Sequence, residues 1–184
     1  MNVIVEEDGA DALLRVIVAL GDYSHEADQD LGHRRHRARA DIGVLLNRAK
    51  YHPESPRSQE DAQANLVGLL LKELESDPRL AVADAVVAVP SSRGTFSNDI
   101  AADLEHGLKI PVYIGRARVQ GGRAAKNHAV KRQYDVDTRL DDMSVVIFDD
   151  VYDTGSSLYA LASAAIAAGA KNCAGLVIAR KLSG

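Results

Sequence analysis

The sequence is poor in several residue types whose presence would point to particular kinds of protein. Cysteine occurs once, at Cys173, which excludes an internal disulfide and any zinc site built on paired cysteines. Tryptophan is absent, and aromatic residues make up only 4% of the chain. No apolar run approaches the ~20 residues that a membrane span needs. The segment Met1 to Asp11 carries acids where a secretory signal would carry basic residues, so we expect a cytoplasmic protein.

A strong charge of either sign is also missing. The formal net charge is −4 and the isoelectric point about 5.8, so no general basic field draws the whole molecule onto nucleic acid. The most basic run extends from His33 to Arg39. It contains no aromatic residue and continues directly into a helical pattern, which favours a solvated helix start or linker. A nucleic-acid contact is the alternative, and it would be local to this run.

Short apolar runs of strand length stand out in the second half of the chain. They are rich in β-branched residues and hardly alternate with polar ones, which is typical of parallel strands covered on both faces. The runs are Ala85 to Val89, Ile110 to Ile114, Val145 to Phe148 and Gly175 to Ala179. The apolar start, Asn2 to Val5, is compatible with an extra edge strand.

Helical patterns lie between and before these runs. In the second half they cover Asn98 to Leu108 and Ser156 to Ala168, with Gly169 placed where a helix commonly ends. In the first half we expect helices at Asp11 to Leu20, Ala40 to Ala49 and Ser58 to Leu74, the last opened by Ser58 and Asp61 in a spacing close to a capping box. Tyr51 to Arg57, with two prolines, reads as a loop.

The alternation of strand and helix predicts the fold class. Repeated strand, helix, strand units indicate an α/β protein with an open, doubly wound, mostly parallel sheet. The length of 184 residues suits one domain, residues 1–184. We expect a mainly helical N-terminal part, residues 1–80, and a ligand-binding core, residues 81–184.

The most informative segment follows the third of these strands. Val145 to Phe148 run into Asp149, Asp150, Val151, Tyr152, Asp153, Thr154, Gly155, Ser156 and Ser157, where a helix begins. Ligands of open α/β sheets bind outside the carboxyl ends of strands. The loop Asp153 to Ser157 offers backbone N–H groups, a glycine and hydroxyls at a helix N-terminus, which suits a phosphate. It has neither the lysine of a Walker A loop nor the spacing of a dinucleotide turn.

Asp149 and Asp150 need a different partner, because adjacent carboxylates would repel a phosphate that touched them. Carboxylates accept hydrogen bonds from a ribose cis-diol and help to order Mg²⁺ through water. A phosphate on the loop and a diol on the acids together describe a phosphorylated pentose. The alternative is an ordinary strand-to-helix turn with two solvated acids.

The run Val145 to Ser157 resembles the signature of type I phosphoribosyltransferases, which bind 5-phosphoribosyl-1-pyrophosphate (PRPP). The signature has four apolar residues, two acids, two mostly apolar residues, a small or acidic residue, then Thr, Gly, any residue, and Ser or Thr. Tyr152 is bulkier than the aliphatic residue usual there. The resemblance implies PRPP binding by residues 149–157, catalysis supported by Asp149 and Asp150, and Mg²⁺ held indirectly by the same acids through ribose or water.

The family resemblance extends to two more segments. Ser91, Ser92, Arg93 and Gly94 follow the strand Ala85 to Val89 and resemble the family's pyrophosphate loop, in which Arg93 would bridge pyrophosphate oxygens. Without the family, Arg93 is an exposed arginine in a turn. Arg116 to Arg132 is basic and has little apolar periodicity, so it reads as a long loop. The family has a flexible loop here, from which Lys126 or Arg123 would neutralise the leaving pyrophosphate, unless this is only a solvated basic loop.

The wider arrangement is most similar to the ComF-type branch, which is associated with competence. The likeness rests on Leu46 to Tyr51, on Arg93, Gly94 and Phe96 to Asn98, and on Arg123, Asn127 and Tyr134. Because the one cysteine of the sequence is Cys173, residues 1–80 do not contain the cysteine-rich zinc module of that branch. The resemblance implies a phosphoribosyltransferase that takes PRPP, Mg²⁺ and a small nitrogenous acceptor and works as a homodimer. A non-catalytic PRPP-binding regulator and a DNA-uptake accessory of ComF type are the alternatives.

Overall fold

A computed structural model gives the three-dimensional structure of the protein. It describes residues 13–23, 42–51, 55–91, 94–118 and 133–181, together with the backbone of residues 2–6. The chain forms one six-stranded sheet and a separate two-stranded ribbon. The sheet strands are β1 (Asn2–Glu6), β2 (Val16–Tyr23), β3 (Ala85–Ala88), β4 (Val112–Ile114), β7 (Ser144–Tyr152) and β8 (Asn172–Lys181). The ribbon consists of β5 (Arg116–Ala117) and β6 (Tyr134–Asp135).

The sheet has the order β1-β2-β8-β7-β3-β4, and all neighbours are parallel except β1 and β2. This confirms the predicted open, mostly parallel α/β sheet, and β1 is the extra edge strand that the apolar N-terminus suggested. From β3 the chain adds β4 on one side, whereas β7 and β8 lie on the other. The order of strands therefore reverses between β3 and β7, which makes their carboxyl ends the expected ligand edge.

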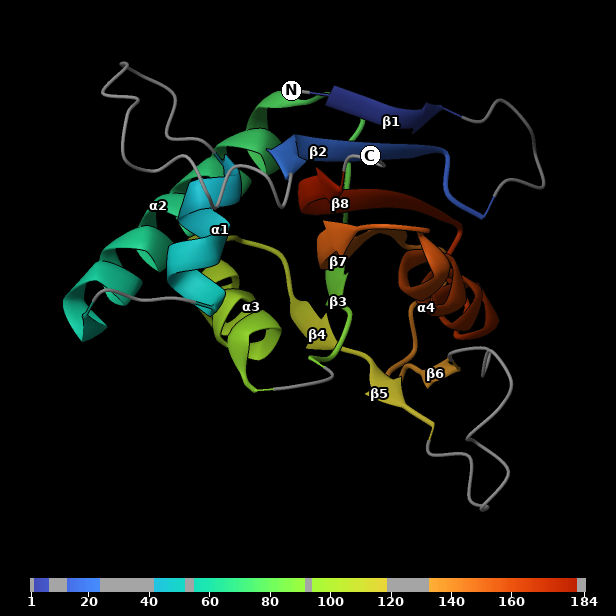
Figure 1. Ribbon diagram of the computed structural model, residues 1–184. Coiled ribbons are helices and arrows are strands. Elements are labelled where there is room, and N and C mark those ends of the chain that lie inside the picture. Colours follow the sequence, from blue (N-terminus) through green and yellow to red (C-terminus); the bar gives the residue numbers. More distant parts are fainter. Residues whose placement is uncertain are drawn as a thin grey trace, which may run out of the picture.

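Helices cover both faces of the sheet (Figure 1). They are α1 (Ile42–Lys50), α2 (Pro56–Ser76), α3 (Phe96–Gly107) and α4 (Ser156–Ala167). The first three share a hydrophobic core with one face, and α4 packs on the opposite face. Along β7, Val146 and Phe148 face the α1–α3 side while Val145 and Ile147 face α4, so the strand is buried on both faces as its composition predicted.

The helix predicted for Asp11 to Leu20 is wrong, because residues 16–23 form β2. Val16 to Ala19 are all buried, and β2 pairs in parallel with β8 from Ile17 to Tyr23. A short apolar run fits a helix and a buried strand equally well by periodicity. The open edge of β8 decides between them, since pairing there satisfies the backbone groups of both strands. The N-terminal part therefore adds strands to the sheet as well as helices.

Two smaller features also differ from the predictions. β4 is an edge strand, and Ile114 is exposed rather than buried on both faces, because only β3 pairs with it. Helix α2 is capped by Ser55, whose hydroxyl accepts a hydrogen bond from the Ser58 amide at 3.1 Å. Pro56 then occupies the first turn, where a missing N–H costs nothing.

None of the helices in the described part of the chain is both long and apolar enough to cross a membrane.

Helix α1 docks on β2 at a glycine. A Cβ atom on Gly21 would lie 2.8 Å from Cγ1 and 2.9 Å from Cβ of Ile42, the first residue of α1. Such distances are too short for real carbon atoms, so a larger residue would push α1 away from the sheet. The close approach of α1 matters because its last residue, Lys50, reaches the ligand edge.

We predict that Gly21→Ala destabilises the protein by about 1–3 kcal/mol through overpacking against α1. The matched control is Gly68→Ala on the exposed side of α2, where an added Cβ meets nothing within 4 Å. This control should stabilise the helix by ~1 kcal/mol, because alanine is the better helix former. Urea unfolding of both variants measures the difference, and equal effects of the two would contradict the docking described here.

Candidate active site

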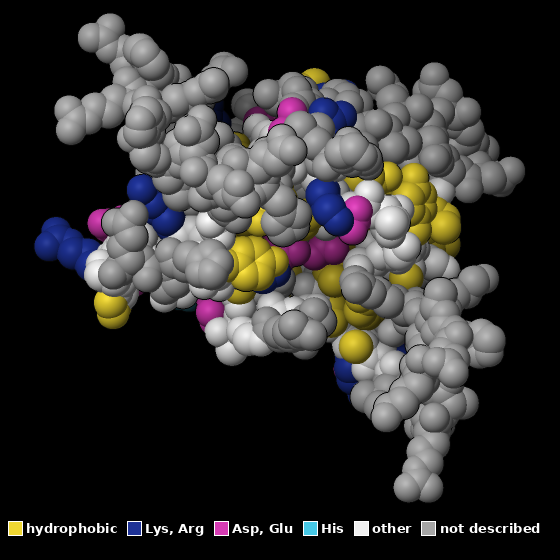
Figure 2. All heavy atoms as spheres, in the orientation of Figure 1, with side chains coloured by type: hydrophobic (Ala, Val, Ile, Leu, Met, Phe, Trp, Pro, Cys, Tyr) yellow, Lys and Arg dark blue, Asp and Glu magenta, His cyan; other side chains and the backbone are white. Residues whose placement is uncertain are grey.

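Asp149 and Asp150, the acid pair, lie where β7 pairs with only one neighbouring strand. β7 pairs with β3 only as far as Phe148, which is opposite Ala88, whereas pairing with β8 continues to Tyr152 opposite Arg180. The strand is thus longer than the four apolar residues predicted, and Asp149 and Asp150 belong to its last part. That part is open on the side of β3, at the point where the strand order reverses. Figure 2 shows acidic side chains gathered near the centre of this face, beside hydrophobic and basic ones.

Asp149 is buried, with 9% of its surface exposed. Its carboxylate accepts a hydrogen bond from the Asp150 amide at 2.9 Å. Burial is the main reason that the pKa of Asp149 rises to about 7, and the charge of Asp150 raises it further, against the opposing effects of the amide and of Lys50. A carboxyl group that titrates near neutral pH at a strand end is typical of a functional site.

Asp150 forms an ion pair with Lys50, the last residue of α1. Both side chains are largely covered, with 20% of Lys50 and 13% of Asp150 exposed. Burial lowers the pKa of Lys50, but the charge and hydrogen bond of Asp150 outweigh it and leave the pKa above its ordinary value. The ammonium also lies 5.0 Å from the ring centre of Tyr51 and 5.7 Å from that of Phe96. The N-terminal part thus contributes a cation to the ligand edge.

The turn after β7 has the geometry expected of a phosphate-binding loop. Gly155 takes the left-handed conformation, with φ 74°, and stands at the N-cap of α4 without a capping side chain. A Cβ there would lie 2.8 Å from the ring of Tyr152, so the turn requires glycine on two counts. The hydroxyls of Thr154 and Ser156 are 2.7 Å apart. The helix N-terminus and these exposed hydroxyls suit an anion.

A second cation stands beside this loop. Lys181, at the end of β8, donates a hydrogen bond to the Asp153 carboxylate at 3.1 Å. Arg180, the residue before it, instead bonds Asp22 at the end of β2 at 3.0 Å. The end of β8, one of the two strands next to β7, therefore carries two basic side chains that partly balance the acids of this edge.

The loop after β3 reaches the same edge from the other side. Ser91 accepts a hydrogen bond from the Ser97 amide at 2.9 Å through its hydroxyl, which orders the start of α3. Gly94 adopts a left-handed conformation, with φ 69°. Ser92 and Arg93 lie outside the described residues, so their predicted role in pyrophosphate binding stays a prediction.

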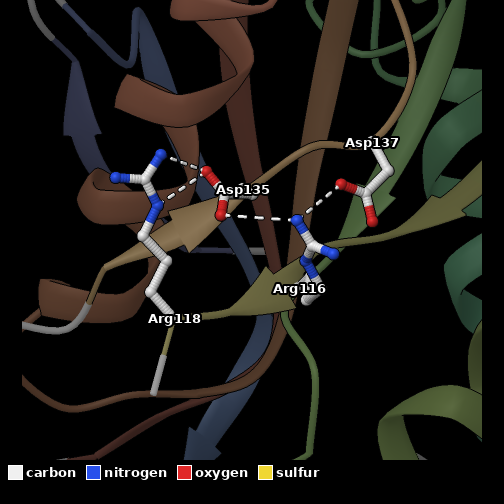
Figure 3. A network of polar contacts seen from close by, with 4 residues as sticks. All are labelled: Arg116, Arg118, Asp135 and Asp137. Carbon is white, nitrogen blue, oxygen red and sulfur yellow. Dashed lines mark hydrogen bonds and ion pairs between the residues drawn. The ribbon is translucent and has the colours of Figure 1, made fainter. Parts of the chain in front are cut away.

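In the sequence, β5 and β6 lie just before and just after residues 119–132, and Figure 3 shows the ion pairs of this ribbon. Arg118 donates to Asp135 at 2.7 Å through Nε, and Arg116 lies 3.1 Å from Asp137 and 3.7 Å from Asp135. The hydrogen bond from Arg118 holds the pKa of Asp135 below its ordinary value. Arg116 and Arg118 are thus paired in a ribbon, where a loop was predicted. Lys126 and Arg123, like the basic run at 33–39, lie outside the described residues.

The donor set fits a metal ion only in an indirect role. Among the described residues, no group of three or more His, Cys, Asp or Glu side chains is placed to hold a metal. Asp149 and Asp150 offer carboxylate oxygens, the kind of ligand that Mg²⁺ takes in proteins, but Mg²⁺ usually keeps several waters and binds substrate phosphates as well. These acids therefore suit Mg²⁺ that is carried by a phosphorylated ligand.

Comparisons with known proteins found similar solved structures but no matching family. No protein-family model matches this sequence, and no curated protein matches it either. Similar solved structures include a purine phosphoribosyltransferase from Pyrococcus horikoshii, at 22% identity and a TM-score of 0.47, covering 64% of this chain and 82% of that one. A hypoxanthine-guanine phosphoribosyltransferase from Bacillus anthracis has 23% identity and a TM-score of 0.46, covering 67% and 71%.

An orotate phosphoribosyltransferase from Aeropyrum pernix is also similar. It has 24% identity and a TM-score of 0.45, covering 67% of this chain and 63% of that one. At such identities the interpretation of the site depends on its own residues.

Sequence reasoning missed the two lysines of this edge as site residues. Lys50 lies 100 positions from Asp150, and Lys181 follows β8 without any motif around it. Lys50 falls inside Leu46 to Tyr51, a stretch noted only for its likeness to the ComF-type branch, and no local pattern marks Lys181. The one indirect signal is that Asp149, Asp150 and Asp153 lie close together in the sequence and need cations to balance their charge.

Asp149 should make stability depend on pH. Its pKa is raised from 3.8 to about 7 in the folded protein, so the folded state binds more protons than the unfolded state between these values. The free energy of unfolding therefore falls as pH rises through this window. We predict that Asp149→Asn stabilises the protein at pH 8 by about 2–4 kcal/mol, since one pKa unit corresponds to ~1.4 kcal/mol.

Urea unfolding from pH 3.5 to 8 measures this effect. The advantage of Asp149→Asn should shrink on acidification and become small near pH 3.5, where the aspartate is mostly protonated in both states. Asp142→Asn is the control, because Asp142 is exposed and has a positive φ of 60°, which asparagine also tolerates. A gain for Asp149→Asn that does not change with pH would contradict the buried, ionised carboxylate.

Proposed function

We propose that this protein binds PRPP with Mg²⁺ and transfers its phosphoribosyl group to a nitrogen acceptor, releasing pyrophosphate. The observation that carries the proposal is the junction at the end of β7. There an acid pair, a left-handed glycine turn and the N-terminus of α4 follow one another at the point where the strand order reverses. This junction suits a phosphorylated pentose, because the turn and helix suit its phosphate and the acid pair suits its ribose diol.

The 5-phosphate would bind the loop from Asp153 to Ser157. Glycine at 155 lets the backbone approach the ligand, and the positive end of the α4 dipole favours a dianion. Thr154 and Ser156 add hydroxyl donors next to it. Lys181 lies within reach of the loop through its contact with Asp153, so a bound phosphate has a cation nearby.

The ribose diol would bind the acid pair. Asp149 and Asp150 supply acceptor oxygens for two hydroxyls, and their negative charge stabilises the positive charge that develops on the ring as the C1–O bond breaks. The pyrophosphate would extend toward the loop after β3, with Ser91, Ser92, Arg93 and Gly94, and toward Lys126 of the long segment.

In this reaction the main task of the protein is to position the substrate. The acceptor nitrogen forms a bond to C1 while the bond from C1 to the pyrophosphate oxygen breaks, and the proton of the nitrogen passes to solvent water. The protein holds the phosphate and the diol at fixed places, which brings C1 into line with the acceptor. Mg²⁺, when bound with PRPP, offsets the charge of the departing pyrophosphate.

A regulator that binds PRPP without using it is the second candidate. The ion pair between Lys50 and Asp150 favours it in one respect, because a cation already occupies an acid that the diol needs. The two candidates share the binding site and differ in turnover. The proposal also includes a small nitrogenous acceptor, a relation to the ComF-type branch and assembly as a homodimer. Each of these is tested by an experiment of its own.

Calorimetric titration of PRPP with Mg²⁺ tests the binding site. We predict micromolar binding to the wild type and a loss of at least about 100-fold in the Asp149→Asn/Asp150→Asn variant, since two buried hydrogen-bonded acceptors are worth ~1.4–3 kcal/mol each. The control is Glu60→Gln/Asp61→Asn, which neutralises two adjacent acids on the exposed face of α2. It should bind PRPP like the wild type.

A screen for pyrophosphate release against pooled nucleobases follows the titration. Release with one base supports the transferase and names the acceptor, whereas binding without release with any base supports the regulator. If the wild type binds no PRPP, or the double variant binds it as well as the wild type does, the proposed function is wrong.

A further inference from the structure

We propose that Lys50 is a pyrophosphate-binding residue of this site, supplied by the N-terminal part of the chain. The inference rests on the proposed function and assigns a role to a residue outside the PRPP signature. In the structure the ammonium is bonded to Asp150. When the ribose diol binds this acid, the ammonium moves to an oxygen of the pyrophosphate on C1.

The position of Lys50 carries the first part of the argument. Its ammonium is bonded to Asp150, near the end of β7, and lies 5.7 Å from the ring centre of Phe96, the first residue of α3. Helix α3 begins directly after the loop that follows β3, and Ser91 of this loop is bonded to the second residue of α3. Lys50 is therefore on the side of the acid pair that faces the proposed pyrophosphate loop.

The second part is the division of charge along the edge. Among the described residues, each side of the turn after β7 has one lysine paired with an aspartate. Lys181 pairs with Asp153 on the phosphate loop, next to β8. Lys50 pairs with Asp150 on the side of β3 and α3. PRPP carries one anionic group at each end of its ribose, so the two lysines are placed like its two anionic groups.

The third part is the chemistry of the side chain. An ammonium has three donors on a flexible stem, so it can leave one oxygen for another without movement of α1. The aromatic rings of Tyr51 and Phe96 stabilise it while it moves, because cation–π attraction depends little on direction within the ring face. When the Lys50 ammonium leaves Asp150 for pyrophosphate, it has an anionic partner both before and after the move.

The test compares three ligands with Mg²⁺ by calorimetry: PRPP, inorganic pyrophosphate and ribose 5-phosphate, which lacks the group on C1. Lys50→Met keeps the length of the side chain and removes its charge. We expect PRPP and pyrophosphate to bind at least about tenfold more weakly, and ribose 5-phosphate to bind equally or more tightly because Asp150 is released. Lys50→Arg should bind PRPP within about threefold of the wild type.

Lys72→Met is the charge control, because Lys72 is an exposed lysine of α2 away from the site. It should leave the binding of all three ligands unchanged. An equal loss for PRPP and ribose 5-phosphate in Lys50→Met would overturn the inference, since Lys50 would then only hold α1 to β7. Unchanged PRPP binding in Lys50→Met would also overturn it while leaving the proposed function intact. A wild type that binds none of the ligands overturns both.

A measurement on the wild type covers the case in which Lys50→Met unfolds. Acetic anhydride labels free amines, and peptide mass spectrometry reads the labelling of Lys50. Labelling should rise with ribose 5-phosphate, which displaces Lys50 from Asp150, and fall again when pyrophosphate is added. Labelling that stays the same with every ligand would show that the ion pair never opens and that Lys50 does not bind pyrophosphate.

Discussion

The one-sided pairing at the end of β7 is the constraint on which the site depends. β3 stops at Ala88, whereas β8 continues to Lys181, so the last residues of β7 are held by a single neighbour. This single ladder is enough to fix the backbone at Asp149 and Asp150. Because the other flank is open, the same residues can face a ligand. A β3 strand longer by a few residues would fill the place where PRPP is proposed to bind.

Two adjacent acids at a half-buried strand end cost stability, and the surrounding structure reduces this cost. The Asp150 amide and Lys50 both act against the rise in the pKa of Asp149. Lys50 is available only because α1 docks closely on β2, at Gly21. The packing of the N-terminal part and the charge of the site are therefore linked. If Lys50 binds pyrophosphate as proposed, this link also joins ligand binding to the N-terminal part.

Local patterns predicted the parts of the fold that are locally encoded. The apolar runs at 85–89 and 145–148 are strands because their composition suits burial on both faces, and Ser156 to Ala168 closely matches α4, with Gly169 in a positive φ just beyond it. Residues 16–23 were misread because an apolar run has no helical or strand period of its own. The pairing partner, β8, is more than 150 residues away in the chain, and no local signal points to it.

The sequence by itself determined the acid pair, the glycine turn and the helix that follows, because strand, turn and helix signals are all local and occur here in one continuous segment. It also determined the mostly parallel sheet, through the alternation of its elements. Only the tertiary structure decided that residues 16–23 join the sheet, that β7 is open beside its acids, and that Lys50 and Lys181 stand at the site. These features depend on contacts between segments far apart in the chain, whose free energy no short stretch of sequence contains.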